Sequence, residues 1–173
     1  SGEGSIPEPW LMFQDCKFSH AVMAAILAQG FKAPTPIQAC CWPLAFAKRD
    51  VVGVAQTGSG KTLAYVIPAF AQIANGQHAG PIRGLGPRML VLAPTRELAV
   101  QIQTEADKFG DTLRVRSASL YGGAPRGPQL GALKGGVHLV VGTPGRLNDF
   151  LEGGQLSLSA VQFLVVDEAD QML

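Results

Sequence analysis

The chain has 173 residues, with 14 Lys and Arg against 13 Asp and Glu, so its formal net charge is only +1. This balance excludes a broad basic surface, and any contact with a polyanion must come from a few well-placed groups. Hydrophobic residues make up 47% of the chain, which is enough for one buried core, yet no apolar run is long enough to span a membrane and no signal peptide is visible.

The N-terminal part of the chain differs from the rest. We expect an extended lead over residues 1–12, a helix at about 19–29 and, after a proline-punctuated turn, a second helix near 37–47. The lead is not counted in the main domain, which we place at 13–173.

From residue 51 onward, short apolar runs alternate with helical patterns. We expect strands at 51–55, 89–93, 115–121, 138–142 and 161–166, and helices at about 61–74, 96–109, 128–134 and 145–152. A Gly- and Pro-rich loop at 75–88 interrupts the pattern, and its role is left open. Strands that are apolar on both faces and alternate with helices predict an α/β fold, in which helices flank both faces of a parallel β-sheet.

Cysteine and histidine give no sign of a structural cross-link. Cys16, Cys40 and Cys41 form no CxxC pair, so we expect reduced thiols. The three histidines lack the spacing of metal ligands. We therefore expect an intracellular protein, in the nucleus, the cytoplasm or both, with no membrane partner.

The segment AQTGSGKT (55–62) has the features of a phosphate-binding loop. Gly58 and Gly60 let backbone N–H groups curl around an anion, and the following helix adds its partial positive charge. Lys61 can reach the β- and γ-phosphates, and the Thr62 hydroxyl can bind Mg²⁺. The motif usually opens with Gly, whereas this one opens with Ala55. The alternative is a glycine-rich turn with an incidental lysine.

Three carboxylates follow the last predicted strand, in VDEAD (166–170). Ligands of open α/β sheets gather beyond the carboxyl ends of the strands. Asp167 is therefore a candidate Mg²⁺ ligand, directly or through water, and Glu168 could orient or deprotonate an attacking water. Asp170 could bridge to neighbouring loops or favour a helix start. A charge cluster at a helix start is the alternative for all three acids.

Several motifs occur together in one order along the chain. They are GFKAPTPIQ (30–38), AQTGSGKT (55–62), PTRELAVQ (94–101), GG (122–123), TPGR (143–146) and DEAD (167–170). In this respect the chain closely resembles the first RecA-like domain of DEAD-box ATP-dependent RNA helicases, from about Phe13 to Leu173. The resemblance implies a P-loop NTPase fold that stops just after the DEAD motif, with the second RecA-like domain absent. IPEPW (6–10) and YGGAPRGPQ (121–129) are similar to the branch that works in RNA processing and ribonucleoprotein remodelling.

The resemblance implies a nucleotide site for ATP and Mg²⁺. Phe31 would stack on adenine, Gln38 would hydrogen-bond its edges, Thr35 would support the loop and Phe13 would be the upstream aromatic residue. Without the family match, an aromatic residue and a Pro-rich turn that pack the domain edge would be favoured. The phosphate contacts would come from Gln56, Thr57, Gly58, Ser59, Gly60, Lys61 and Thr62, the metal contacts from Thr62 and Asp167, and the catalytic groups would be Lys61, Asp167 and Glu168.

The resemblance also implies contacts with the sugar–phosphate backbone of RNA, which position a strand without reading its sequence. The residues would be Pro94, Thr95, Arg96, Gly123, Thr143 and Arg146. Ordinary helix capping with solvated arginines is the alternative.

The expected activity is RNA-dependent ATP hydrolysis coupled to local RNA unwinding or ribonucleoprotein remodelling. The second RecA-like domain would supply an arginine for the transferring phosphoryl group, so we expect this chain alone to bind nucleotide weakly and to be nearly inactive. We also expect an unusual C-terminal sheet edge or incomplete ordering there and, for the whole protein, possible ribonucleoprotein partners. The rival interpretations are a nucleotide-gated RNA clamp without unwinding and a P-loop phosphotransferase.

Overall fold

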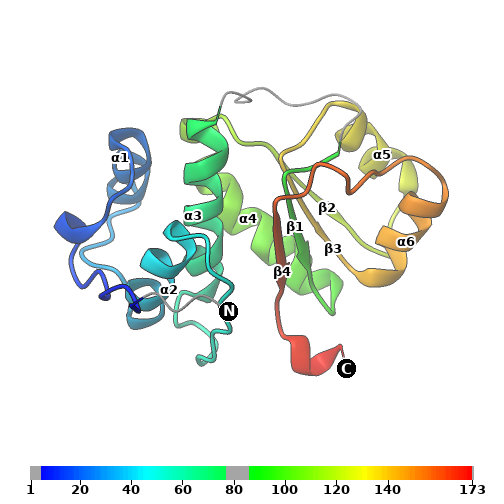
Figure 1. The fold of residues 1–173 in the computed structure, drawn as a ribbon. Helices are drawn as coiled ribbons and strands as arrows, with labels where there is room; N and C mark the ends of the chain where they lie inside the picture. The colour runs from blue at the N-terminus through cyan, green and yellow to red at the C-terminus, as the bar shows by residue number, and fades with distance from the viewer. Residues whose placement is uncertain (1–4, 77–85, 173) are drawn as a thin grey trace. The chain divides into compact units, whose positions relative to one another are not determined.

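The computed structural model describes residues 5–76 and 86–172, and packing divides the chain into two compact units, Ser1–Gln72 and Ile73–Leu173 (Figure 1). Most of the predicted 75–88 loop and His78 lie outside the described residues. None of the described helices is both long and apolar enough to cross a membrane. The assignment of 13–173 to one domain stays a prediction.

The first unit is helical. Its elements are η1 (Phe13–Asp15), α1 (His20–Ala28), α2 (Pro36–Phe46) and the start of α3 (Lys61–Asn75), which runs into the second unit. Both predicted N-terminal helices and the predicted helix at 61–74 are therefore confirmed. Proline at the first position of α2 fits a helix start, because its missing N–H would have no partner there.

The N-terminal lead is tied down by an aromatic cluster. Trp10 is buried, and its ring meets Phe18 and Phe46 edge-on at centroid distances of 5.4 and 5.6 Å. The backbone N–H of Trp10 donates to the carbonyl of Ala39 at 2.9 Å. Edge-to-face rings and a satisfied backbone donor hold the lead against α2.

The predicted strand at 51–55 is wrong for this structure. Val52 and Val54 are 94% and 93% exposed, and no described strand pairs with the segment. A short apolar run becomes a strand only when a neighbour pairs with its N–H and C=O groups, and β-propensity cannot supply that neighbour. The phosphate loop therefore precedes a helix, as predicted, but does not follow a strand here.

The second unit is a parallel four-stranded sheet with the order β2-β3-β1-β4. Its elements are β1 (Met89–Leu92), α4 (Arg96–Leu113), β2 (Ser117–Leu120), α5 (Arg126–Lys134), β3 (Leu139–Gly142), α6 (Pro144–Glu152), β4 (Phe163–Val166) and η2 (Ala169–Gln171). These elements confirm the predicted strands and helices of this half of the chain, within a few residues at each end.

Successive residues of β2 contact different helices. Ser117 donates its hydroxyl to Asp107 of α4, so this face of the sheet meets α4. Ala118 and Leu120 instead pack with Leu147 and Phe150 of α6. Helices therefore cover both faces of the sheet, as the sequence predicts.

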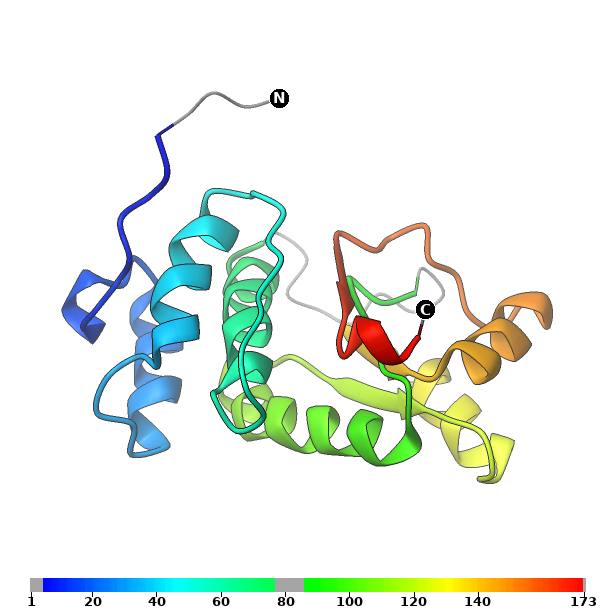
Figure 2. The same cartoon turned by 90° about the horizontal axis from the view of Figure 1, so that it is seen from below.

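The last strand departs from the prediction of burial on both faces. β4 pairs only with β1 and forms an edge of the sheet, and Leu164 and Val166 are 63% and 46% exposed. The chain then turns into η2 (Figure 2).

Candidate functional site

The phosphate-loop segment folds as a turn that leads directly into α3. Gly58 and Gly60 have φ values of +80° and +89°, which glycine adopts without the steric cost of a Cβ. The N–H of Ser59 donates to the carbonyl of Gln56 at 3.2 Å, which closes the turn. Lys61 begins α3, so the first N–H groups of that helix open onto this turn.

The side chain of Lys61 bends back over the turn. Its Nζ donates to the carbonyl of Ala55 at 2.7 Å. An ammonium group held at the mouth of a helix N-terminus places positive charge where a phosphate group would be stabilised. Thr62 is the next residue of the helix and is half-buried.

Gln38 joins the predicted adenine segment to the phosphate loop. Its amide Nε2 donates to the carbonyl of Gly60 at 3.2 Å, while its Oε1 accepts from the N–H of Thr35 at 3.0 Å. The side chain is buried, and a Cβ on Gly60 would lie only 2.6 Å from Gln38 Nε2. The two predicted nucleotide motifs are therefore in direct contact.

Two buried hydroxyls near this contact have unused hydrogen-bonding capacity. Among the described residues, Ser59 Oγ has no hydrogen-bond partner, and Thr35 Oγ1 has at most the N–H of Gln38, in a capping box. Buried polar groups of this kind favour a polar ligand, because an unmatched hydroxyl is costly. Phe31 is 42% exposed and Phe13 is half-buried, so both rings retain free surface. Together with the turn and the helix N-terminus, these groups fit a nucleotide.

The acidic motif lies at the end of β4. The N–H of Asp167 donates to the carbonyl of Leu92 at 3.0 Å, which continues the pairing with β1, and its Oδ1 accepts from the N–H of Glu168 at 3.0 Å. Glu168 has a φ of +49° and accepts a hydrogen bond from Gln171 at 2.9 Å. A left-handed conformation is unusual for glutamate and is typical of constrained functional turns. Asp170 is exposed in the first turn of η2.

No group of three or more His, Cys, Asp or Glu side chains in residues 5–76 and 86–172 could hold a metal ion. Mg²⁺ is commonly bound by one or two carboxylates together with the phosphates of a substrate. Thr62 and Asp167 each offer an oxygen donor of the kind that Mg²⁺ prefers. Thr62 belongs to the first unit and Asp167 to the second.

Four of the six predicted RNA contacts lie where β1 and β3 run into their helices. Pro94 and Thr95 follow β1, and Arg96 begins α4; Thr143 follows β3 and is the N-cap of α6. Thr95 Oγ1 accepts from the N–H of Leu98 at 3.2 Å, so the alternative role of helix capping holds for this residue.

This position is the topological switch point of the sheet. β1 and β3 are neighbours, but the helix after β1 covers one face and the helix after β3 covers the other. The two connections turn toward opposite faces, and open α/β sheets bind ligands beyond the carboxyl ends of the strands at such a point. Four of the six residues predicted to contact RNA therefore lie at the position that the topology marks for a ligand.

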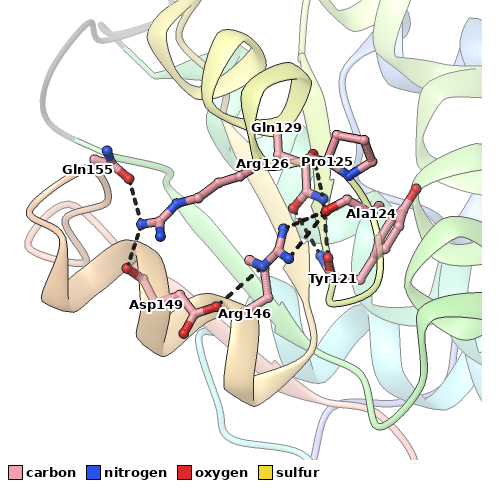
Figure 3. Close-up of polar contacts among 8 residues, drawn as sticks. All are labelled: Tyr121, Ala124, Pro125, Arg126, Gln129, Arg146, Asp149 and Gln155. Carbon is pink, nitrogen blue, oxygen red and sulfur yellow. Dashed lines mark hydrogen bonds and ion pairs between the residues drawn. The ribbon is translucent and has the colours of Figure 1, made fainter.

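The remaining two predicted RNA contacts are in the loop after β2 and in α6. Gly123 is exposed and has a φ of +74°. Arg146 donates from both terminal nitrogens to the carbonyl of Ala124 at 3.3 Å, and its Nε lies 3.4 Å from Asp149 Oδ2 (Figure 3). Its side chain is only 12% exposed. Arg146 is thus not the solvated arginine of the alternative interpretation.

A family model described as DEAD/DEAH box helicase matches residues 35–173, which is most of the chain. The chain belongs to the DEAD/DEAH box helicase family. The parallel sheet and its flanking helices have the RecA-like fold of that family.

Solved helicase structures have the same fold. RNA helicase Prp28 from Chaetomium thermophilum, bound to ADP, matches with a TM-score of 0.87 and 40% identity, over 98% of this chain and 41% of that chain. The yeast DEAD-box splicing factor Prp28 matches with a TM-score of 0.87 and 36% identity, over 98% and 40% of the two chains.

Among curated sequences, DEAD-box ATP-dependent RNA helicase 30 of Oryza sativa subsp. japonica is 52% identical over 97% of this chain and 25% of its own length. ATP-dependent RNA helicase DBP2 of Chaetomium thermophilum is 53% identical over 97% of this chain and 30% of its own length. The chain spans about a quarter to a third of the curated helicases that it matches.

The sequence did not single out two residues of α5 that make long-range contacts. Gln129 is buried beneath the loop after β2, and Arg126 donates to the carbonyl of Asp149 and to Gln155 Oε1, both at 2.8 Å. The only sequence signal is that both lie in YGGAPRGPQ (121–129). No local period marks them, because their partners lie on other elements.

Proposed function

We propose that the chain is the nucleotide-binding RecA-like domain of an ATP-dependent RNA helicase. It binds ATP with Mg²⁺ and the sugar–phosphate backbone of RNA, and the whole protein couples ATP hydrolysis to local RNA unwinding or ribonucleoprotein remodelling. The observation that carries the proposal is the hydrogen bond from Gln38 to Gly60. This contact supports a single site in which the amide would read the base and the turn would bind the phosphates.

Each side chain of the nucleotide site would have one role in binding. Phe31 supplies an exposed face for stacking on the base, and the Gln38 amide can both donate to and accept from adenine. Lys61 and the N-terminus of α3 stabilise the phosphates. Thr62 and Asp167 would hold Mg²⁺, which neutralises charge on the phosphates when bound. Glu168 would orient or deprotonate the attacking water.

The RNA half rests on the switch point of the sheet. Helix N-termini after β1 and β3, together with the glycine loop after β2, present backbone N–H groups and a few cationic side chains to a strand. A nearly neutral domain can bind a polyanion in this way. The contacts would read the backbone and not the bases.

Because the chain is a fraction of its relatives' length, ligand binding and rapid catalysis would depend on different parts of the whole protein. The chain binds both ligands, whereas the second RecA-like domain of the whole protein supplies the arginine needed for rapid phosphoryl transfer, a contact worth about 10³–10⁵ in rate. ATP turnover by the chain alone should therefore stay near background.

The test uses the 173-residue chain. Fluorescence titration with methylanthraniloyl-ADP and Mg²⁺ should show weak binding that unlabelled ADP competes away and GDP does not. Fluorescence anisotropy with two short single-stranded RNAs of unrelated sequence should give similar affinities that fall with salt. Equal competition by GDP, or a strong preference for one RNA sequence, would overturn the corresponding half. RNA-stimulated ATP hydrolysis at the rate of an intact helicase would overturn the dependence of rapid catalysis on the second RecA-like domain.

A further inference from the structure

The loop after β2 carries two glycines that the packing of this chain does not explain. A Cβ built on Gly122 or on Gly123 would meet no atom within 4 Å. Gly123 needs glycine for its φ of +74°, but Gly122 has no such requirement. Glycine in open space is typical of a backbone that another molecule approaches closely.

Beneath this loop, Gln129 of α5 pairs with the backbone of Tyr121. The N–H of Tyr121 donates to Gln129 Oε1 at 3.2 Å, and Gln129 Nε2 donates to the carbonyl of Tyr121 at 3.2 Å (Figure 3). Nε2 also lies 3.5 Å from the carbonyl of Pro125. The amide thus acts like the edge of a neighbouring strand and satisfies both backbone groups of the residue where the loop begins.

This pairing depends on the chemistry of an amide. A carboxamide offers one acceptor and two donor hydrogens at the same end, whereas an ionised glutamate offers only acceptors. Gln129 is only 8% exposed, so an apolar side chain of similar size would leave two backbone groups unpaired beneath the loop.

Two arginines hold the same loop from other helices. The guanidinium of Arg96 lies 4.9 Å from the centre of the Tyr121 ring, and Arg146 donates to the carbonyl of Ala124. Side chains of α4, α5 and α6 therefore fix the loop at both ends. The two glycines between these ends remain exposed.

We propose that Gln129 is a positioning residue for RNA binding, which holds the Gly122–Gly123 backbone in the shape that receives a sugar–phosphate unit. Gln129 lies beneath the loop and does not contact the RNA itself. Its effect is preorganisation, because a loop that is already ordered loses less conformational freedom on binding. This inference rests on the proposed RNA-binding function of the same edge of the sheet.

The experiment compares Gln129→Met with Gln155→Met in the 173-residue chain. Gln155 is exposed and accepts a side-chain hydrogen bond from Arg126, so its replacement removes a comparable contact away from the glycine loop. We expect Gln129→Met to weaken binding of a short single-stranded RNA about 5- to 30-fold, the loss expected for one or two hydrogen bonds, and to leave ADP affinity within about twofold of wild type. Gln155→Met should change neither affinity.

Two further variants keep the inference testable if Gln129→Met folds poorly. Gln129→Glu should bind RNA weakly at about pH 7.5 and recover at about pH 5 relative to wild type, because burial raises the pKa of a carboxyl at this site and its protonation restores a donor to the Tyr121 carbonyl. Gly122→Ala should leave the unfolding midpoint unchanged but weaken RNA binding, since its Cβ enters open space over the loop.

The outcomes separate this inference from the proposed function. A wild-type chain that binds no RNA overturns both. Wild-type binding that Gln129→Met and Gly122→Ala leave unchanged overturns the positioning role alone. A parallel loss of RNA affinity, ADP affinity and thermal stability in Gln129→Met would show that the residue only supports the fold, and this too would overturn the positioning role.

Discussion

The amide Nε2 of Gln38 donates to the carbonyl of Gly60, 22 positions further along the chain. The same amide accepts from the N–H of Thr35, so one side chain spans the start of α2 and the turn before α3. A change in the position of either segment must move the other. The position of the Gln38 side chain and the shape of the phosphate loop are therefore mechanically linked in this chain.

Replacement of Gln38 by Ala should weaken ADP binding about 5- to 30-fold, because hydrogen bonds to the base and the contact with Gly60 are lost together. Isothermal titration calorimetry with ADP and Mg²⁺ would measure the change. Gln14→Ala is the matched control, since Gln14 is an exposed glutamine of the same unit. Equal ADP affinity of the Gln38→Ala and Gln14→Ala chains would contradict this role for Gln38.

Gly60→Ala should lose more nucleotide affinity than Gly58→Ala. Both glycines have positive φ, so both substitutions introduce backbone strain of about 1–3 kcal/mol. Only at Gly60 would the new Cβ also collide with Gln38 Nε2, at 2.6 Å; at Gly58 it would meet open space. Titration with methylanthraniloyl-ADP compares the two variants directly. If they lose the same affinity, strain alone governs the turn and the Gln38 contact has no separate effect.

The sequence predicts the sheet of the second unit well because unbroken apolar runs mark its buried strands. Runs such as Met89–Leu92 and Leu139–Gly142 are apolar at every position, and only a strand with both faces covered buries such a run. The segment at 51–55 carries the same signal, yet Val52 and Val54 are almost fully exposed. An apolar run indicates a segment that can be buried, but it does not identify the strand that would pair with that segment.

The residues of the candidate site also differ in how well the sequence predicts them. The glycines of the phosphate loop are predictable, since positive φ and close approach to an anion require that residue type. The contact between Gln38 and Gly60 is not predictable, because no local sequence pattern connects residues this far apart. Gln129 is still less predictable. Its function in the fold depends on facing the backbone of Tyr121, which only the packing of α5 determines.

Gly142→Ala should destabilise the second unit. The residue ends β3, and a Cβ there would lie 2.6–2.9 Å from three side-chain carbons of Leu147 of α6, which is buried in the core. Overpacking of this kind costs about 1–3 kcal/mol, and each kcal/mol should lower the unfolding temperature by roughly 2–4 °C. Gly145→Ala is the matched control: its Cβ meets no atom within 4 Å, and alanine favours a helix. Thermal unfolding should shift in opposite directions for the two variants, and a shared direction would argue against the contact with Leu147.

Cys16 should resist alkylation at neutral pH. Burial, and then the neighbouring Asp15 carboxylate, raise the pKa of its thiol from 9.0 to about 11, because both disfavour the thiolate. The reaction of iodoacetamide with Cys16, followed by mass spectrometry, should accelerate about tenfold per pH unit from about pH 8 to about pH 10 without reaching a plateau. In the denatured chain the rate should level off near the ordinary thiol pKa.

The unfolded chain loses the Cys16 proton first, so this group should also lower the free energy of unfolding as the pH rises from 9.0 to about 11. Asp15→Asn is the decisive variant, since removal of the carboxylate should lower the Cys16 pKa and speed alkylation at every pH in this range. A folded wild-type chain whose alkylation rate levels off as early as that of the denatured chain would show that neither burial nor Asp15 protects the thiol.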